Sequence, residues 1–112
     1  MERGEIWWAS MVEPRGSEPG YHRPVIIVSS NKFNQSLIQT VIVAVVTSNL
    51  RLVDAPGNFK ITKKNSGLNK DSIVNVSQLI TLDKSFLTEQ IGKLNSKNIN
   101  FLNEGIKLVL GV

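Results

Sequence analysis

The chain has no cysteine and a single histidine among its 112 residues. Without cysteine there can be no disulfide, zinc–thiolate site or thiol nucleophile, and the absence fits a reducing cytoplasm. With His22 as the one histidine, an acid–base pair of two histidines is excluded. The nine carboxylates are scattered along the sequence and offer no convincing set of metal ligands. We therefore expect neither a metal nor another cofactor.

Long apolar runs are also missing. Residues 1–5 are charged and lack the apolar core of a signal peptide. No apolar run approaches the roughly 20 residues that a membrane-spanning helix needs. We expect a cytoplasmic protein that does not enter a membrane, folded as one domain over residues 1–112.

Positive charge is in excess, with a formal net charge of +4. A basic balance favours an anionic partner, with nucleic acid as the first candidate, although mild basicity is also common without a specific partner. The charges balance in residues 1–56, and the excess follows, with four lysines around one predicted turn: Lys60, Lys63, Lys64 and Lys70. Such a cluster either meets phosphates or forms a solvated loop.

Short apolar runs separated by turn residues predict a mainly β protein. The expected strands cover residues 6–9, 24–30, 37–48, 59–62, 72–82 and 91–94, with one helical turn at 31–36. The β-branched run at 41–46 indicates a strand buried on both faces. From Ser96 onward apolar residues recur with helical spacing, Asn95 or Ser96 can cap the helix, and Gly111 can end it. This order suggests a small bent sheet or barrel packed by a terminal helix.

Two polar positions lie at the edges of predicted strands. The loop at 13–23 contains two prolines and two glycines and ends in Arg23, directly before an apolar run. The strand at 37–48 ends in Thr47 and Ser48. Long loops in compact domains are often functional, and a rigid sheet can hold an adjacent side chain still. Arg23 and Thr47 are therefore the candidate catalytic residues, and we expect them to share one cavity.

Several motifs follow one another along nearly the whole chain. They are Arg3-Gly4-Glu5-Ile6-Trp7, GSEPGYHRPVIIVSS, TVIVAVVTSN, Gly67-Leu68, Asp71-Ser72-Ile73-Val74, Ser77-Gln78-Leu79-Ile80-Thr81-Leu82-Asp83-Lys84 and Ile91-Gly92-Lys93-Leu94. Each piece alone is weak, but their order and spacing resemble the MazF/PemK family of toxin ribonucleases from bacterial toxin–antitoxin pairs. The resemblance implies a mainly β, SH3-like β-barrel of the MazF/PemK/CcdB type with a C-terminal helix, working as a homodimer. It also implies metal-free, sequence-specific cleavage of single-stranded RNA and an antitoxin whose disordered tail covers the RNA groove.

The resemblance also assigns site residues. The family's catalytic arginine and threonine fall on Arg23 and Thr47, the loop serine that supports the phosphate on Ser17, and a glutamine of the RNA groove on Gln78. The predicted RNA-binding set is Ser17, Glu18, His22, Ser48 and Gln78. This loop departs from the common GSEQGG-x-RP form because Pro19 replaces the glutamine and Tyr21-His22 precede the arginine. The separation of Ser17 and Arg23 is kept, whereas the surface that borders the substrate is altered.

The expected chemistry is attack of the 2′-hydroxyl on the adjacent phosphorus, which leaves a 2′,3′-cyclic phosphate and a 5′-hydroxyl. A guanidinium can meet two phosphoryl oxygens as their negative charge grows. Arginine is a poor general base because its pKa lies far above neutral, so that its neutral form is scarce. His22 and Glu18 are the nearby groups that titrate usefully, and the base stays unassigned. Along an extended chain, His22 and Arg23 would point to opposite sides.

Other readings of these residues stay open. Arg23 could form a surface salt bridge with Glu18, and Thr47 and Gln78 could be ordinary strand residues. Of Trp7 and Trp8, which face opposite sides of one strand, we expect one in the core and one exposed. The exposed ring could stack on a base or lie in a dimer contact, but a simple packing role is the favoured alternative. A non-nuclease toxin of the gyrase-inhibiting kind, or a non-toxic nucleic-acid-binding protein, would use the same barrel.

Overall fold

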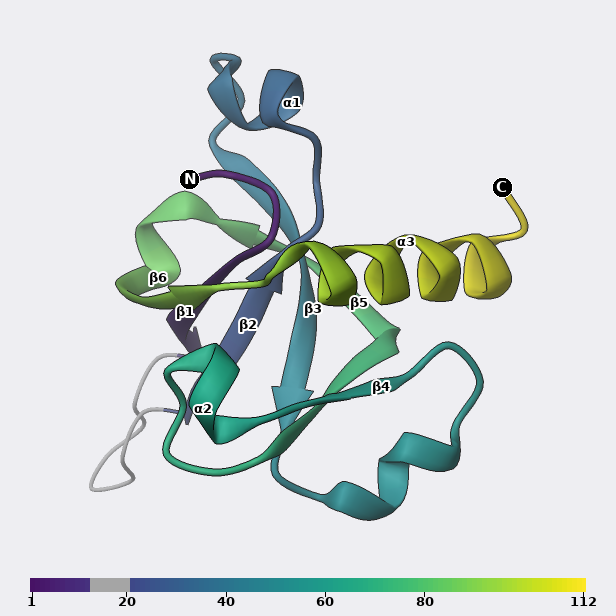
Figure 1. Ribbon diagram of the computed structural model, residues 1–112. Coiled ribbons are helices and arrows are strands. Elements are labelled where there is room, and N and C mark those ends of the chain that lie inside the picture. Colours follow the sequence, from purple (N-terminus) through teal and green to yellow (C-terminus); the bar gives the residue numbers. More distant parts are fainter. Residues whose placement is uncertain (13–20) are drawn as a thin grey trace.

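The computed structural model describes residues 1–12 and 21–112, and it contains one antiparallel sheet (Figure 1). The sheet has six strands in the order β4-β5-β3-β2-β1-β6. Their bounds are β1 (Glu5–Val12), β2 (Tyr21–Ile27), β3 (Thr40–Thr47), β4 (Phe59–Ile61), β5 (Ser72–Asp83) and β6 (Leu87–Lys93). The sheet curls into a half-barrel, and helix α3 (Ser96–Leu110) packs against it. The predicted mainly β fold with a C-terminal helix is confirmed.

Short helical segments connect the strands. They are α1 (Asn31–Gln35), η1 (Leu50–Asp54), α2 (Lys63–Ser66) and η2 (Lys84–Phe86). The helical turn expected at 31–36 is α1, which begins where the Ser30 hydroxyl accepts a hydrogen bond from the Phe33 N–H at 3.2 Å. The turn expected after residue 62 contains α2, because the Thr62 hydroxyl caps the N–H of Asn65. In the described part of the chain, no helix is long and apolar enough to cross a membrane.

Strand β2 begins earlier than the sequence suggested. Its backbone pairs with β1 from Tyr21 onward, with Arg23 opposite Ala9 and His22 opposite Ser10. Arg23 is therefore held inside the sheet and not at the end of a loop. Strand β3 begins later than expected, at Thr40, because Leu37 lies in the preceding connection with 96% of its surface exposed.

Apolar side chains cover both faces of the sheet. On one face a cluster centred on Ile26, Val46 and Leu102 packs between the sheet and α3. On the other face Val25, Val43 and their neighbours form a second cluster. Alternate residues of β3 contribute to the two clusters, which confirms the prediction that this strand is buried on both faces.

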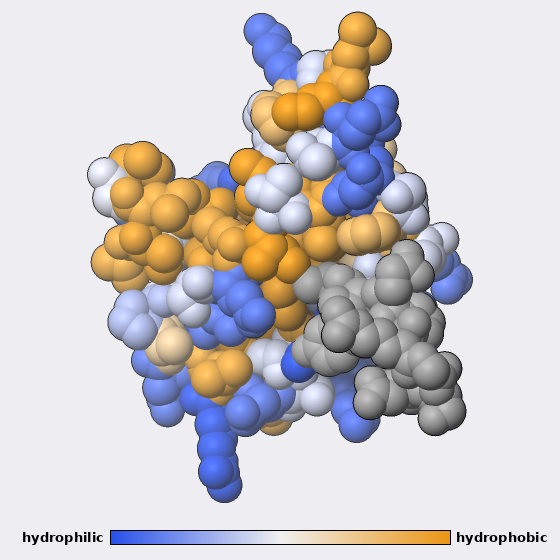
Figure 2. All heavy atoms as spheres, turned by 180° about the vertical axis from the view of Figure 1, so that it is seen from behind, coloured by the Kyte–Doolittle hydropathy of each residue, from blue (hydrophilic) through white to orange (hydrophobic). Residues whose placement is uncertain are grey.

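Helix α3 begins and ends as its sequence predicts. The Asn95 side chain accepts a hydrogen bond from the Asn98 N–H at 2.8 Å, and Gly111 ends the helix with φ +72°. The predicted apolar stripe, however, is only partly buried. Val109 and Leu110 are 38% and 56% exposed because the C-terminal end of the helix extends past the sheet (Figure 1). Apolar side chains gather over this end of α3 and at the α1–β3 connection, with further apolar surface between them (Figure 2).

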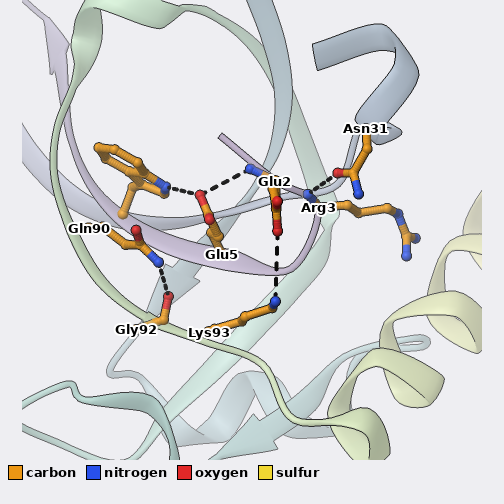
Figure 3. Close-up of polar contacts among 8 residues, drawn as sticks. Glu2, Arg3, Glu5, Asn31, Gln90, Gly92 and Lys93 are labelled. Atoms are coloured by element: carbon orange, nitrogen blue, oxygen red, sulfur yellow. Dashed lines mark hydrogen bonds and ion pairs between the residues drawn. The ribbon is translucent and has the colours of Figure 1, made fainter. Parts of the chain in front are cut away.

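Hydrogen bonds anchor the N-terminal segment beside β1 (Figure 3). The Glu5 carboxylate accepts from the Glu2 N–H and from the Trp7 indole N–H, each at 3.0 Å, and the Arg3 N–H donates to Asn31 at 2.7 Å. Burial alone would raise the pKa of Glu5, but the hydrogen bonds from Glu2 and Trp7 outweigh it and lower that pKa. These contacts fix the start of β1 and the ring of Trp7.

Candidate functional site

A pocket of about 340 Å³ lies where β2 begins and β3 ends. It is lined by Trp8, His22, Arg23, Pro24, Val46, Ser48, Leu68, Asn69, Lys70 and Ser72. Tryptophan, proline, valine and leucine provide an apolar part, and the other residues provide polar groups. Two of the described lining residues are cationic and none is acidic, so the pocket suits an anionic ligand with a flat apolar portion.

The sheet brings the two candidate catalytic residues to the same place. Strands β2 and β3 pair Val25 with Val45, and Arg23 and Thr47 each lie two residues beyond this pair, at the same end of the two strands. Both side chains are half-buried. Arg23 lines the pocket, as does Ser48, whereas Thr47 borders the pocket without lining it. Cross-strand neighbours share one face of a sheet, which is the arrangement that joint contact with one phosphate requires.

Two consecutive turns orient the Thr47 hydroxyl. Its oxygen accepts a hydrogen bond from the Asn49 N–H at 3.2 Å, and the Asn49 side chain in turn accepts from the Arg51 N–H at 3.2 Å. The chain thus turns sharply into η1 directly after β3. While its oxygen accepts from Asn49, the Thr47 hydroxyl can still donate its own hydrogen to an acceptor such as a phosphate oxygen.

The opposite wall of the pocket is a turn at residues 67–72. Gly67 has φ +81°, a conformation that favours glycine, and ends α2. The Leu68 N–H donates to the Ser66 hydroxyl at 3.1 Å, and the Ser72 hydroxyl donates to the Lys70 carbonyl at 3.0 Å. The turn is therefore fixed at both ends by its own hydrogen bonds.

Asp71 holds the middle of this turn. One carboxylate oxygen accepts from the Lys63 N–H at 2.7 Å, and the other lies 3.6 Å from the Lys60 ammonium. The Lys63 hydrogen bond, helped by the charge of Lys60, lowers the pKa of Asp71. The carboxylate thus ties the turn to both β4 and α2.

The four clustered lysines have different surroundings. Lys60 pairs with Asp71, and Lys63 donates its backbone N–H to the same carboxylate. Lys64 is exposed on α2 outside the pocket, whereas Lys70 lines the pocket. From the sequence, this cluster could either contact phosphates or form a solvated loop. In the structure Lys70 is the lysine of the four in the described pocket lining.

The other predicted RNA-binding residues divide into three groups. His22 and Ser48 line the pocket with Arg23. Gln78 lies outside its described lining, in a bulge of β5 where pairing with β3 jumps from Leu79 to Asn75, and its side chain accepts from Asn75 at 3.4 Å. Ser17 and Glu18 lie outside the described residues. The RNA-contacting role of each residue stays a prediction.

The sequence did not identify the far wall of the pocket. Asn69 lies between Gly67-Leu68 and Asp71-Ser72, and these flanking motifs were the available signal. The prediction that one tryptophan is buried and one exposed was wrong, because both are half-buried. Trp7 packs against the second apolar cluster, and Trp8 lines the pocket.

This fold is that of known bacterial toxins. An endoribonuclease in complex with its cognate antitoxin, from a mycobacterial species, superposes with a TM-score of 0.81 at 22% identity, covering 100% of this chain and 96% of that chain. A MazE–MazF crystal structure from Deinococcus radiodurans also gives a TM-score of 0.81, at 19% identity, with 100% and 96% covered. At these identities the likeness establishes the fold: a MazF-type toxin architecture.

The sequence comparison identifies the family. Residues 2–110 match the family model described as "PemK-like, MazF-like toxin of type II toxin-antitoxin system". "Endoribonuclease MazF6" of Mycobacterium tuberculosis is 38% identical over 110 residues, covering 98% of this chain and 96% of that protein. "Endoribonuclease MazF" of Staphylococcus saprophyticus is 35% identical over 112 residues, covering 100% and 92%. The chain belongs to the PemK-like, MazF-like toxin family, and the resemblance stated from its motifs is confirmed.

Proposed function

We propose that this protein is the toxin of a type II toxin–antitoxin pair and cuts single-stranded mRNA at a short sequence without a metal. The observation that carries this proposal is the placement of Arg23 in a cationic pocket, at the end of β2 that lies beside the Thr47 end of β3. The relatives named endoribonuclease cover nearly the whole chain, and they support the same activity. The mRNA substrate places the activity in the cytoplasm.

The chemistry follows from the phosphodiester itself. The 2′-oxygen forms a bond to phosphorus while the bond from phosphorus to the 5′-oxygen breaks, which leaves a 2′,3′-cyclic phosphate and a 5′-hydroxyl. Negative charge grows on the nonbridging oxygens during this step. The Arg23 guanidinium contacts two of these oxygens, and the Thr47 hydroxyl donates a further hydrogen bond. Because these contacts strengthen as charge develops, they lower the barrier and do not merely bind the substrate.

Proton transfer requires a second group. The Arg23 guanidinium suits charge stabilisation, with donation to the leaving 5′-oxygen as a further role. His22 lines the same pocket, and imidazole is a common general acid or base in catalysis. Replacing His22 by alanine and recording the pH–rate profile tests it as the base: removing the base flattens the acid limb, whereas an unchanged profile assigns the role elsewhere, with Glu18 as the other candidate.

The protein partners follow from the family and from the surface. The neighbours that are solved with an antitoxin support a cognate antitoxin here, and we assign its disordered tail to the pocket, where acidic side chains would meet Arg23 and Lys70. The toxin pairs with a second copy of itself. Exposed apolar residues gather at the end of α3 and in the α1–β3 connection, and such gatherings often mark an interface, which supports this homodimer: Leu37, Ile38, Leu108, Val109, Leu110 and Val112.

One experiment tests the activity, its metal independence and its sequence preference. Purified protein is incubated with a mixed RNA pool in the presence of a chelator, and the new 5′-hydroxyl ends are mapped. We expect cuts at one short sequence motif. Intact RNA after this treatment would favour the alternative of a non-nuclease toxin on the same fold. In that case induction of the Arg23→Ala variant would still stop bacterial growth, whereas loss of toxicity in this variant supports the nuclease.

A further inference from the structure

We propose that the part of the pocket lined by Trp8 and by the turn at residues 67–72 is a subsite for one unstacked base next to the scissile phosphate. In this subsite Trp8 provides the stacking surface, Asn69 reads the polar edge of the base, and Lys70 meets a neighbouring phosphate. The inference rests on the proposed ribonuclease function, and it names the residues that select the RNA sequence. Contact of Arg23 with the scissile phosphate leaves these side chains unused.

The size and composition of the pocket fit a single nucleotide. Its volume of about 340 Å³ lies at the lower end of the range of about 300–1,000 Å³ for small-ligand sites. Trp8, Pro24, Val46 and Leu68 provide apolar contact, and polar side chains surround them. A base has the matching surface, with apolar faces and polar edges, and single-stranded RNA is recognised through bases that are splayed out and stacked on aromatic rings.

Trp8 is placed to stack. In β1 it pairs with Pro24 on one side and with Glu89 of β6 on the other, so its backbone is held between two strands. Its ring is half-buried in the pocket lining. The neighbouring Trp7 instead packs against an apolar cluster and gives its indole N–H to Glu5. Within the described residues the Trp8 indole N–H has no hydrogen-bond partner, so the ring is available to contact a ligand in the pocket.

Asn69 is the residue that can discriminate between bases. Its carboxamide offers a donor and an acceptor side by side, the pattern that reads a base edge with two hydrogen bonds. The side chain is exposed and makes no hydrogen bond to another described residue. Its backbone, however, is fixed, because the Leu68 N–H, the Asp71 carboxylate and the Ser72 hydroxyl all hold the turn. A fixed backbone with a side-chain amide that has no partner within the described residues suits a residue that recognises a base by hydrogen bonds.

Lys70 supplies charge beside the same subsite. It lines the pocket and forms no ion pair with a described residue, whereas its sequence neighbour Asp71 is paired with Lys60. The logarithm of the RNA-binding constant falls linearly with the logarithm of the salt concentration, and a lysine that neutralises one phosphate steepens this line by about one unit of slope. Lys64 provides a matched control, since it is exposed on the adjacent α2 and lies outside the pocket lining.

Cut-site mapping tests the selectivity of Asn69. The wild-type protein and Asn69→Ala are compared on the same random RNA pool. We expect the base preference at one position beside the cut to weaken about ten-fold, with the preferences at the other positions and the 5′-hydroxyl ends retained. An unchanged sequence pattern for Asn69→Ala, while the wild type cuts RNA, would overturn the subsite and leave the ribonuclease function standing.

A binding measurement separates the subsite from catalysis. In a Trp7→Phe background, Trp8 is the sole fluorophore of its kind and reports on stacking. The probe is a pool of short 2′-O-methyl RNAs, which lack the attacking hydroxyl and are not cut. We expect RNA binding to quench the fluorescence of Trp8, and the same RNAs with an abasic position to quench it less. The slope of log binding constant against log salt concentration should fall by about one in Lys70→Gln and stay unchanged in Lys64→Gln.

The two measurements fail independently of each other. Quenching that depends on the base, in a protein that never cuts RNA, would retain the subsite and reject the ribonuclease proposal. Cleavage without any quenching of Trp8, or with equal quenching by the base-containing and abasic probes, would reject the subsite. Loss of antitoxin binding in Asn69→Ala and Lys70→Gln, with unchanged RNA cleavage and RNA binding, would assign this wall to the antitoxin and also reject the subsite.

Discussion

Removing the Arg23 guanidinium should abolish most of the cleavage activity while the fold survives. In Arg23→Ala the backbone of residue 23 still pairs with Ala9, so the β1–β2 ladder is retained. The side chain is only half-buried, and we expect the free energy of unfolding to fall by about 1 kcal/mol, the usual size for such a position. A defect in catalysis can therefore be separated from a defect in folding.

The expected magnitude follows from the role of the guanidinium. Loss of one preorganised donor to a developing oxyanion typically slows the chemical step by about 10²–10³-fold, or roughly 2.7–4 kcal/mol of barrier. Arg23 provides two parallel donors and a full charge, so Arg23→Ala should reach at least the upper part of this range. Arg23→Lys keeps the charge but loses the planar fork, and we expect a smaller defect of about 10–100-fold.

The assay is single-turnover cleavage of a short RNA that contains the mapped site, with chelator present. Protein is in excess over RNA, so the observed rate constant reports chemistry and not product release. Thermal unfolding and antitoxin binding of each variant provide the controls for folding. Lys64→Ala, which removes an exposed cation on α2 outside the pocket lining, is the control variant and should cut within about three-fold of the wild type. A rate for Arg23→Ala within ten-fold of wild type would refute the assignment.

Four further outcomes are expected. Thr47→Val keeps the β-branched shape but removes the hydroxyl, so the single-turnover rate constant should fall about 10–100-fold with little change in melting temperature. Leu102→Ala empties a fully buried position between α3 and the sheet and should lower the free energy of unfolding by about 2–5 kcal/mol in chemical denaturation. Leu108→Asp, at a 64% exposed position on α3, should shift the dimer toward monomer in light scattering without loss of helix in circular dichroism. Because the pKa of Asp71 is lowered in the folded state, its carboxylate stabilises the fold above the unfolded-state pKa of about 3.9. The stability difference between wild type and Asp71→Asn should therefore persist from neutral pH to about pH 4 and disappear as pH falls through the lower folded-state pKa.

Local sequence signals predicted most of the fold. The polar cap at Asn95 and the glycine at 111 placed both ends of α3, and the β-branched run in β3 revealed a strand covered on both faces. The errors arose where pairing with distant residues decides the structure. Tyr21 and His22 read as loop in isolation, but their partners in β1 extend β2 through them. The helical spacing of apolar residues predicted that the end of α3 is buried, but no part of the sheet reaches far enough to cover it.

The candidate site was predictable only in part for the same reason. Arg23 and Thr47 could be selected because each lies near the end of an apolar strand and matches a family motif. The flanking motifs and the lysine cluster drew attention to residues 67–72, but they do not indicate that a turn after α2 closes the other side of the pocket. That closure depends on Asp71, whose bonds to Lys60 and Lys63 form only once the chain has folded.

The turn held by Asp71 has a kinetic consequence. Since the wall is already in place before any ligand arrives, capture of RNA should need no slow rearrangement, and the association rate constant should depend on diffusion and ionic strength alone. Good and poor target sequences would then be captured equally fast and would differ in how long they stay bound.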